Sequence, residues 1–255
     1  MSAVFTELRG AVTLDGVSKR YGTARGGVLA LDRITLSIRP GEFVCLVGAS
    51  GCGKSTLLNL AAGLDAPTAG TVRVDGRTAL MFQEAALFPW LTVSRNVDLA
   101  LRLRHRPARE RAGRVAELLD VVQLTGFADK RPHELSGGMR QRVALARALA
   151  QEADVLLMDE PFGALDAMTR DVLHDEVERI WQGTGTTVVF VTHNVREAAR
   201  LADRIVLLTS RPGRVAAEFP VQIERPRRIE SPTVSQLARE VTDHLRQEVA
   251  RHGRR

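Results

Sequence analysis

Long apolar runs are missing from this 255-residue chain. The longest, such as 188–191 and 205–208, are far shorter than the roughly 20 residues that cross a bilayer. The first ten residues carry Glu7 and Arg9 and have no apolar signal-peptide core. We therefore expect a soluble protein that stays in the cytosol.

Cysteine and lysine are also scarce. The two cysteines, Cys45 in an apolar run and Cys52 in a glycine-rich loop, fit neither a disulfide framework nor a zinc site, so a reducing compartment is the simplest interpretation. Lysine occurs three times among the 36 basic residues, at positions 19, 54 and 130. Lys54 therefore does not stand in the glycine-rich loop merely because lysine is common.

Basic residues gather in two segments of the chain, whose formal net charge is +6. Residues 95–114 hold seven arginines against two acids, and residues 225–255 hold eight arginines against four acids. Such segments can meet nucleic acid or an anionic membrane surface. The alternative is that they are solvated helix faces, because acids are interspersed and aromatics make up only 4% of the chain. Composition leaves both interpretations open.

Strand-like and helix-like segments alternate along the chain, which is 44% hydrophobic and long enough for one substantial core. The apolar run at 42–47 is typical of a strand buried on both faces, and residues 54–62 after it have helical spacing. Residues 93–150 are helical throughout, so a helical block is inserted into an α/β core. Further strands are expected at 11–17, 30–38, 71–74, 80–83, 155–158, 188–191 and 204–208.

Turn signals divide the rest of the chain. Asp75-Gly76 is expected to join the strands on either side of it. Arg211-Pro212-Gly213 and Pro226 mark the expected end of compact structure. Beyond them, Ser231-Pro232 is an N-cap signal for an amphipathic helix that runs to residue 251.

A glycine-rich loop at 48–56 matches in full the phosphate-binding pattern of glycine, four residues, glycine, lysine and serine or threonine. Its glycines let backbone N–H groups turn onto phosphate oxygens, and the following helix points its positive end at the same anion. Lys54 is expected to reach the β- and γ-phosphates, and the Ser55 hydroxyl to ligate Mg²⁺. A chance glycine turn is the alternative, but strand and helix flank this one in the required order. The expected ATP-binding residues are Gly48, Ala49, Ser50, Gly51, Cys52, Gly53, Lys54, Ser55 and Thr56.

Two carboxylates, Asp159 and Glu160, follow the apolar strand at 155–158, and open α/β sheets bind their ligands at such strand ends. Asp159 is placed to hold Mg²⁺ directly or through water. Glu160 is suited to polarise the attacking water as a general base. Paired acids at a strand end are often solvated turn residues, but together with the phosphate-binding loop they predict a MgATP site.

The segment 135–141, Leu-Ser-Gly-Gly-Met-Arg-Gln, resembles the signature of one family, the ATP-binding cassette ATPases. Ser136 at a helix start offers N–H donors and a hydroxyl to a γ-phosphate, although Ser-Gly-Gly alone is only a flexible cap. In this family the signature faces the phosphate-binding loop of a second subunit. The resemblance therefore implies a homodimer with two composite ATP sites. The residues implied to bind ATP in trans are Ser136, Gly137, Gly138 and Gln141.

Other residues fall in the order of the family's motifs. Tyr21 resembles the aromatic that stacks on adenine, although a lone tyrosine near a strand is more often a packing residue. Gln83 resembles the glutamine that contacts Mg²⁺ and the attacking water, and His193 resembles the switch histidine at the γ-phosphate. The segment 163–166, which ends at Asp166, resembles the loop through which the two subunits sense each other. The resemblance thus implies Lys54, Gln83, Glu160 and His193 as catalytic residues and Ser55, Gln83 and Asp159 as magnesium ligands.

The resemblance covers nearly the whole chain and implies an α/β fold. This fold is a P-loop NTPase core, RecA-like with a mostly parallel sheet, joined to an N-terminal antiparallel β-subdomain and an inserted helical subdomain. Residues 1–230 would form a single ATPase domain, and 231–255 a C-terminal helical extension. The expected parts are 11–40 and 70–83 for the mainly antiparallel subdomain, 41–69 and 151–210 for the ATP-binding core, and 93–150 for the helical signature subdomain.

Two segments, 82–93 and 210–214, look like the importer subunits for nitrate, sulfonate and taurine. Exposed aromatics and a proline just after Gln83 suit the docking of a cytoplasmic permease helix. The alternative is that Phe88 and Trp90 simply cover the core.

The resemblance implies an ATP-hydrolysing subunit of an importer for a small oxyanion or sulfonate. Its partners would be ATP with Mg²⁺, a second ATPase subunit, integral-membrane permease subunits and a periplasmic or lipid-anchored substrate-binding protein. It would lie peripherally on the cytoplasmic face of the cell membrane. An exporter ATPase and a cassette ATPase acting on nucleic acid are the alternatives. A nucleic-acid partner is not expected, because there is one cassette, no coiled-coil insertion between Lys54 and Ser136, and no zinc cysteines.

Overall fold

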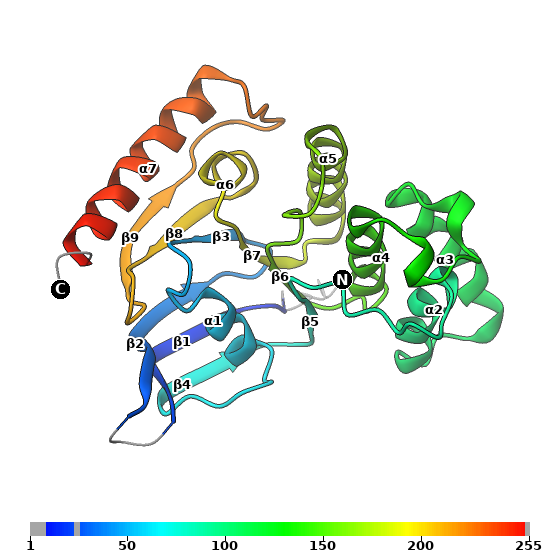
Figure 1. The fold of residues 1–255 in the computed structure, drawn as a ribbon, viewed down its shortest axis with the longest axis horizontal. Helices are drawn as coiled ribbons and strands as arrows, with labels where there is room; N and C mark the ends of the chain where they lie inside the picture. The colour runs from blue at the N-terminus through cyan, green and yellow to red at the C-terminus, as the bar shows by residue number, and fades with distance from the viewer. Residues whose placement is uncertain (1–8, 23–25, 253–255) are drawn as a thin grey trace, which may run out of the picture.

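The chain forms two β-sheets (Figure 1). The computed structural model describes residues 9–22 and 26–252. The smaller sheet has three strands in the order β2-β1-β4, paired antiparallel. The larger has six strands in the order β5-β6-β7-β3-β8-β9, all parallel except for the antiparallel edge strand β9. The strands are β1 (Val12–Tyr21), β2 (Val28–Ile38), β3 (Phe43–Val47), β4 (Ala69–Val74), β5 (Thr78–Met81), β6 (Val155–Asp159), β7 (Thr187–Val191), β8 (Arg204–Leu208) and β9 (Val215–Pro220).

Helices cover both faces of the larger sheet, and a further group of helices lies beyond its β5 edge (Figure 1). One group, α2, α3 and α4, forms the block inserted between β5 and β6, with the 3₁₀ turns η1 and η2 between α3 and α4. The helices are α1 (Lys54–Ala61), α2 (Val93–Leu103), α3 (Ala108–Val121), α4 (Gly137–Leu149), α5 (Ala167–Thr184), α6 (Val195–Leu201) and α7 (Pro232–His252), and the 3₁₀ turns are η1 (Thr125–Phe127) and η2 (Pro132–Glu134). The predicted fold class, a mostly parallel α/β core with an antiparallel sheet and a helical insertion, is confirmed.

Strand β3 lies between β7 and β8 in the larger sheet, and both of its faces are buried. Val44 and Leu46 point into a core that the two sheets share with Leu57 and Leu58 of α1. The alternate residues, including Phe43, point into a second core built with the helices of the opposite face. The phosphate-binding loop therefore starts from the most enclosed strand of the molecule.

Strand β5 corrects one expectation. The turn at Asp75-Gly76 joins β4 to β5 as expected, but the prediction that all of 70–83 belongs to the antiparallel subdomain is wrong for β5, which pairs in parallel with β6 in the larger sheet. The turn lets the chain leave the small sheet instead of folding back on it. Gly76 makes this possible with a φ of 96°, and Asp154 accepts a hydrogen bond from the Arg77 N–H at 2.7 Å.

The compact structure does not end at 211–213 or at Pro226, in contrast to the expectation from the turn signals. Strand β9, which was not predicted, pairs with β8, and the chain then returns over α6 to α7. The buried Arg227 guanidinium donates to the carbonyl oxygens of Arg200 and Ala202, which fixes this return. The predicted C-terminal helix is present as α7, and its apolar face packs into the core.

The docking of α7 predicts a measurable stability effect. Val241 is fully buried on this helix, so Val241→Ala should lower the free energy of unfolding by about 2 kcal/mol in urea denaturation. Gln247→Ala, at an exposed position of the same helix, is the matched control and should change it by less than about 0.5 kcal/mol. Equal effects of the two substitutions would mean that α7 is not part of the core in solution.

Candidate functional site

The phosphate-binding loop joins β3 to α1 and turns sharply before the helix. Gly53 stands at the N-cap of α1 with a φ of 95°, a conformation that side chains disfavour. The Lys54 side chain is folded back under the loop, where Nζ donates to the carbonyl oxygens of Gly48 at 2.8 Å and Ala49 at 3.1 Å. The loop thus holds a buried ammonium group whose partners are neutral carbonyls, ready for an anion.

A cavity of about 720 Å³ opens over this loop. Its walls come from the loop, from the start of β2 and from the carboxyl ends of the parallel strands. Of the expected loop residues, Gly48, Ala49 and Cys52 are not part of the lining, and Gly48 and Cys52 are buried. The lining residues are Val28, Leu29, Ala30, Ser50, Gly51, Gly53, Lys54, Ser55, Thr56, Gln83, Glu160, His193 and Arg211.

Asp159 ends β6 behind the loop. Burial raises the pKa of this carboxyl, and a hydrogen bond with the Ser55 side chain opposes the shift. Hydroxyl, carboxylate and amide oxygens are the donors that Mg²⁺ prefers. Ser55, Asp159 and Gln83 would therefore suit a magnesium ion that bridges to phosphate, and such an ion would also balance the buried charge.

Glu160 has a strained backbone at the mouth of the cavity. Its φ of 46° lies in the left-handed region that residues other than glycine rarely adopt. The side-chain Oε2 lies 3.4 Å from Gln83 Nε2 and 3.2 Å from His193 Nδ1. Three of the four predicted catalytic residues thus meet at one carboxylate oxygen, although Gln83 and His193 lie 77 and 33 residues from Glu160 in the sequence.

A buried polar network supports the turn that carries His193. Thr192 Oγ1 donates to Glu197 Oε2, and the other oxygen of Glu197 lies 2.6 Å from His174 Nε2. His174 is fully buried on α5, so the network connects this helix to α6. Sequence analysis missed this network, because neither His174 nor Glu197 belongs to a recognisable motif. The only signal was a histidine on the inner face of a helix, which by itself is an ordinary core residue.

The signature residues lie at the start of α4. Ser136 is exposed and caps the helix by accepting a hydrogen bond from Met139 N at 3.2 Å. Gln141 is buried instead and donates to the Gln83 carbonyl at 3.0 Å. The structure therefore connects Gln141 to Gln83 of the same chain, while Ser136 and Gly137 stay exposed outside the lining of the cavity.

Two other expected residues stand apart from the cavity lining. Asp166 caps α5 and accepts from Thr169 N at 2.9 Å, and these hydrogen bonds lower the pKa of its carboxyl. Tyr21 donates to Asp65 Oδ2 at 3.0 Å and exposes 42% of its surface. One face of the Tyr21 ring meets the Lys19 ammonium group, 4.9 Å from the centroid. The role of Tyr21 in adenine stacking stays a prediction.

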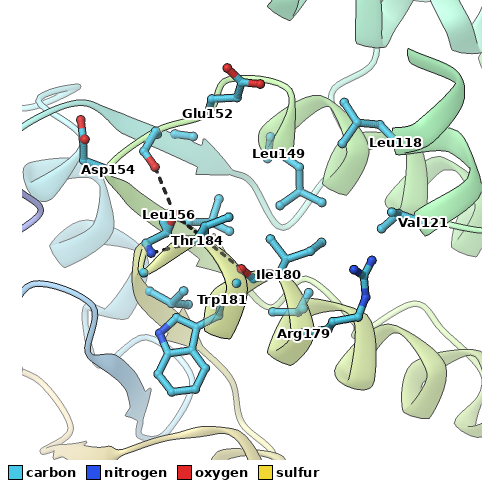
Figure 2. A pocket seen from close by; sticks show the side chains of 18 of the residues that line it. Leu118, Val121, Leu149, Glu152, Asp154, Leu156, Arg179, Ile180, Trp181 and Thr184 are labelled. Atoms are coloured by element: carbon cyan, nitrogen blue, oxygen red, sulfur yellow. Dashed lines mark hydrogen bonds between the residues drawn. The ribbon is translucent and has the colours of Figure 1, made fainter. Parts of the chain in front are cut away.

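A larger cavity, of about 1190 Å³, lies away from this chemistry (Figure 2). Leu118, Leu149 and Ile180 point into it from α3, α4 and α5. Asp154 and Thr186 are also among its lining residues. Asp154 and Thr186 precede β6 and β7, so this cavity opens at the amino ends of the parallel strands. Ligands of such sheets bind at the opposite edge, so the cavity over the phosphate-binding loop is the candidate functional site.

The fold and this site together define a P-loop nucleoside triphosphatase. The family model described as ABC transporter matches residues 31–163. The chain belongs to this family of ATP-binding cassette proteins and is an ATP-hydrolysing subunit, which confirms the family predicted from the motifs. Among its described residues, no helix has the length and apolar character needed to span a membrane.

Relatives and solved structures agree with this assignment. The nitrate import ATP-binding protein NrtD of Synechocystis sp. is 49% identical over 207 residues, which cover 78% of each chain. The taurine import ATP-binding protein TauB of Jannaschia sp. is 43% identical over 217 residues, covering 82% of this chain and 81% of that protein. A dimeric ATP-binding cassette solved after hydrolysis with ADP and phosphate matches with a TM-score of 0.78 and 35% identity, over 84% of this chain and all of that one.

The geometry at Glu160 predicts a separation of binding from turnover. Glu160→Gln keeps the side-chain shape but removes the base, so ATP hydrolysis should fall roughly a hundredfold or more. Affinity for a fluorescent ATP analogue should stay within about twofold. Phosphate release and fluorescence titration measure the two quantities, with Glu117→Gln on the exposed face of α3 as the control. Hydrolysis at the wild-type rate in Glu160→Gln would remove this residue from the general-base role.

Proposed function

We propose that this ATPase is bound at the cytoplasmic face of a membrane and powers the import of a small anion. The observation that carries the proposal is a surface loop, residues 83–91, which runs from the site to an exposed aromatic pair. Phe88 and Trp90 lie with ring centroids 5.6 Å apart, and Trp90 exposes 67% of its surface. An apolar surface of this kind suits a helix of a permease subunit.

The loop is held rigidly by groups that sequence analysis did not identify. Asn96 is fully buried on α2, accepts from Phe88 N at 2.9 Å and donates to the Phe88 carbonyl at 3.2 Å. Arg147 of α4 donates to the carbonyls of Ala85 and Ala86 at 2.9 and 2.8 Å. A displacement of the aromatic pair would therefore be passed to the backbone near Gln83 instead of being absorbed by a loose loop.

Gln83 connects this loop to the chemistry. Its amide reaches Glu160, and its carbonyl accepts from Gln141 of the helical insertion. A bound permease helix and the bound nucleotide would thus act on one short segment. This arrangement supports coupling between hydrolysis and movement of a membrane partner.

The composite site would need a second copy of the chain. Ser136 is exposed, caps its helix and lies outside the lining of the cavity of its own chain. We infer that it meets the γ-phosphate bound to the partner's loop, so that ATP with Mg²⁺ closes a homodimer and hydrolysis opens it. Within each chain, Lys54 would hold the phosphates, and Ser55, Asp159 and Gln83 would hold the magnesium ion. Glu160 would orient the attacking water, and Gln83 and His193, which contact its carboxylate, would position it.

The similar proteins support a substrate class. The similar proteins are import ATP-binding proteins for nitrate and taurine and transport ATP-binding proteins for bicarbonate. Each of these substrates carries an oxyanion group, and none of these proteins is named for export or for nucleic acid. We propose an importer for a small oxyanion or sulfonate, with separate permease subunits and an extracytoplasmic binding protein supplying the selectivity.

Uptake by the reconstituted complex tests this function. Liposomes carrying the chain with its cognate permease, with ATP on the ATPase side, should accumulate nitrate, bicarbonate or taurine on that side when the binding protein is present on the other. Trp90→Ala should lower this transport at least tenfold while nucleotide affinity stays unchanged. Val249→Ala, an exposed apolar residue of α7, should leave transport as it was. ATP-driven movement in the opposite direction would establish an exporter instead.

A further inference from the structure

The turn between β8 and β9 is built against the phosphate-binding loop. Thr209 N donates to the Arg214 carbonyl at 2.9 Å, and Thr209 Oγ1 donates to the Pro212 carbonyl at 2.8 Å. Arg214 N in turn donates to Thr209 Oγ1 at 2.9 Å. These three bonds close residues 209–214 into a defined turn, which contains the segment 210–214 that resembled the importer subunits.

Gly213 fixes the turn in place. Its N–H donates to the Ala30 carbonyl and its carbonyl accepts from Asp32 N, both at 2.9 Å, so the turn adds to the edge of β2. A Cβ at position 213 would lie 2.2 Å from the Cys52 carbonyl oxygen. Only glycine allows this approach, and the turn therefore touches the backbone of the phosphate-binding loop directly.

Arg211 projects from this turn onto the same loop. A Cβ placed on Gly51 would lie 2.9 Å from one terminal nitrogen of the Arg211 guanidinium, so the group lies against the loop backbone. Arg211 also lines the cavity together with Ser50, Lys54 and His193. Across the described part of the chain, no carboxylate pairs with it. By contrast, Arg214 of the same turn pairs with Asp32 at 2.8 Å.

An unpaired guanidinium at the wall of a phosphate site has a clear physical use. It presents planar N–H donors that match phosphate oxygens, and it stays charged at any physiological pH. The turn holds its backbone still, so little ordering is needed when an anion arrives. Arg211 lies outside the phosphate-binding loop at 48–56 and outside the signature at 135–141.

We propose that Arg211 is a further phosphate ligand of the bound nucleotide, acting from the β8–β9 turn within the same chain. Together with Lys54, it would hold the phosphate chain of a nucleoside diphosphate or triphosphate from a second direction. The inference rests on ATP binding by the loop at 48–56 and extends it to a residue outside the loop. It requires no dimer, because the turn and the loop belong to one chain.

Titration of the purified chain with fluorescent ADP and ATP analogues in the presence of Mg²⁺ tests the proposal. Arg211→Gln should weaken both affinities roughly tenfold or more, as expected for a lost hydrogen bond to a charged group. Arg211→Lys should recover part of the loss because it keeps the charge. Arg214→Gln removes the same charge three residues away and should leave both affinities within about twofold. Thermal unfolding without nucleotide should be unchanged in Arg211→Gln, since the side chain is exposed.

Three results would overturn the assignment. Unchanged ADP and ATP affinities in Arg211→Gln would show that the guanidinium does not touch the phosphates. Normal ADP affinity with a loss confined to ATP-dependent dimerisation would place Arg211 at a partner chain. Equal losses in Arg211→Gln and Arg214→Gln would show that only the shape of the turn matters. A wild-type chain that bound neither analogue would instead reject nucleotide binding itself.

Discussion

The parallel register of β3, β6, β7 and β8 is the constraint on which the site depends. Parallel strands end at the same edge of a sheet, so whatever follows them is brought together regardless of sequence separation. The phosphate-binding loop follows β3, Glu160 follows β6, His193 follows β7 and Arg211 follows β8. Backbone bonds continue the register past the strands, from Glu160 N to the Val191 carbonyl and from Thr192 N to the Leu46 carbonyl.

The same edge stores strain and charge that the fold tolerates for its chemistry. Asp159 is buried beside another carboxylate, Glu160 has a left-handed backbone, and the Lys54 ammonium group has only uncharged partners. Bound MgATP would satisfy the two charge conditions at once, because magnesium would balance the acids and phosphate would pair with the lysine. The charged groups of the site therefore complement a ligand better than they complement one another.

Contacts also run outward from Glu160 to the surface. Gln83 joins the carboxylate to the loop that ends in Phe88 and Trp90, and Gln141 joins the same residue to the helical insertion. Chemistry at the cavity and contact at the exposed aromatic pair thus share a short, hydrogen-bonded segment. Such continuity supports the proposed coupling between hydrolysis and the movement of a membrane partner.

Much of this arrangement could be predicted, because the motifs are local. The phosphate-binding loop, the acids after β6 and the cap at Ser136 each follow from neighbouring residues. Strand β5 was assigned to the wrong sheet because its four residues contain no mark of their partner, and β9 was missed because its residues alternate weakly at a sheet edge. Asn96, Arg147, His174 and Arg211 were missed for a different reason. Their roles come from tertiary contacts, which no spacing in the sequence records.

We propose that two chains form two composite ATP sites and that each chain contributes one half of each site. Light scattering of the hydrolysis-deficient Glu160→Gln protein tests it most directly, by its molar mass with and without MgATP. We predict a mass of one chain without nucleotide and of two chains with it, and a return to one chain in the additional variant Ser136→Glu. A single-chain mass at saturating MgATP, or a dimer unaffected by the change at Ser136, would contradict it.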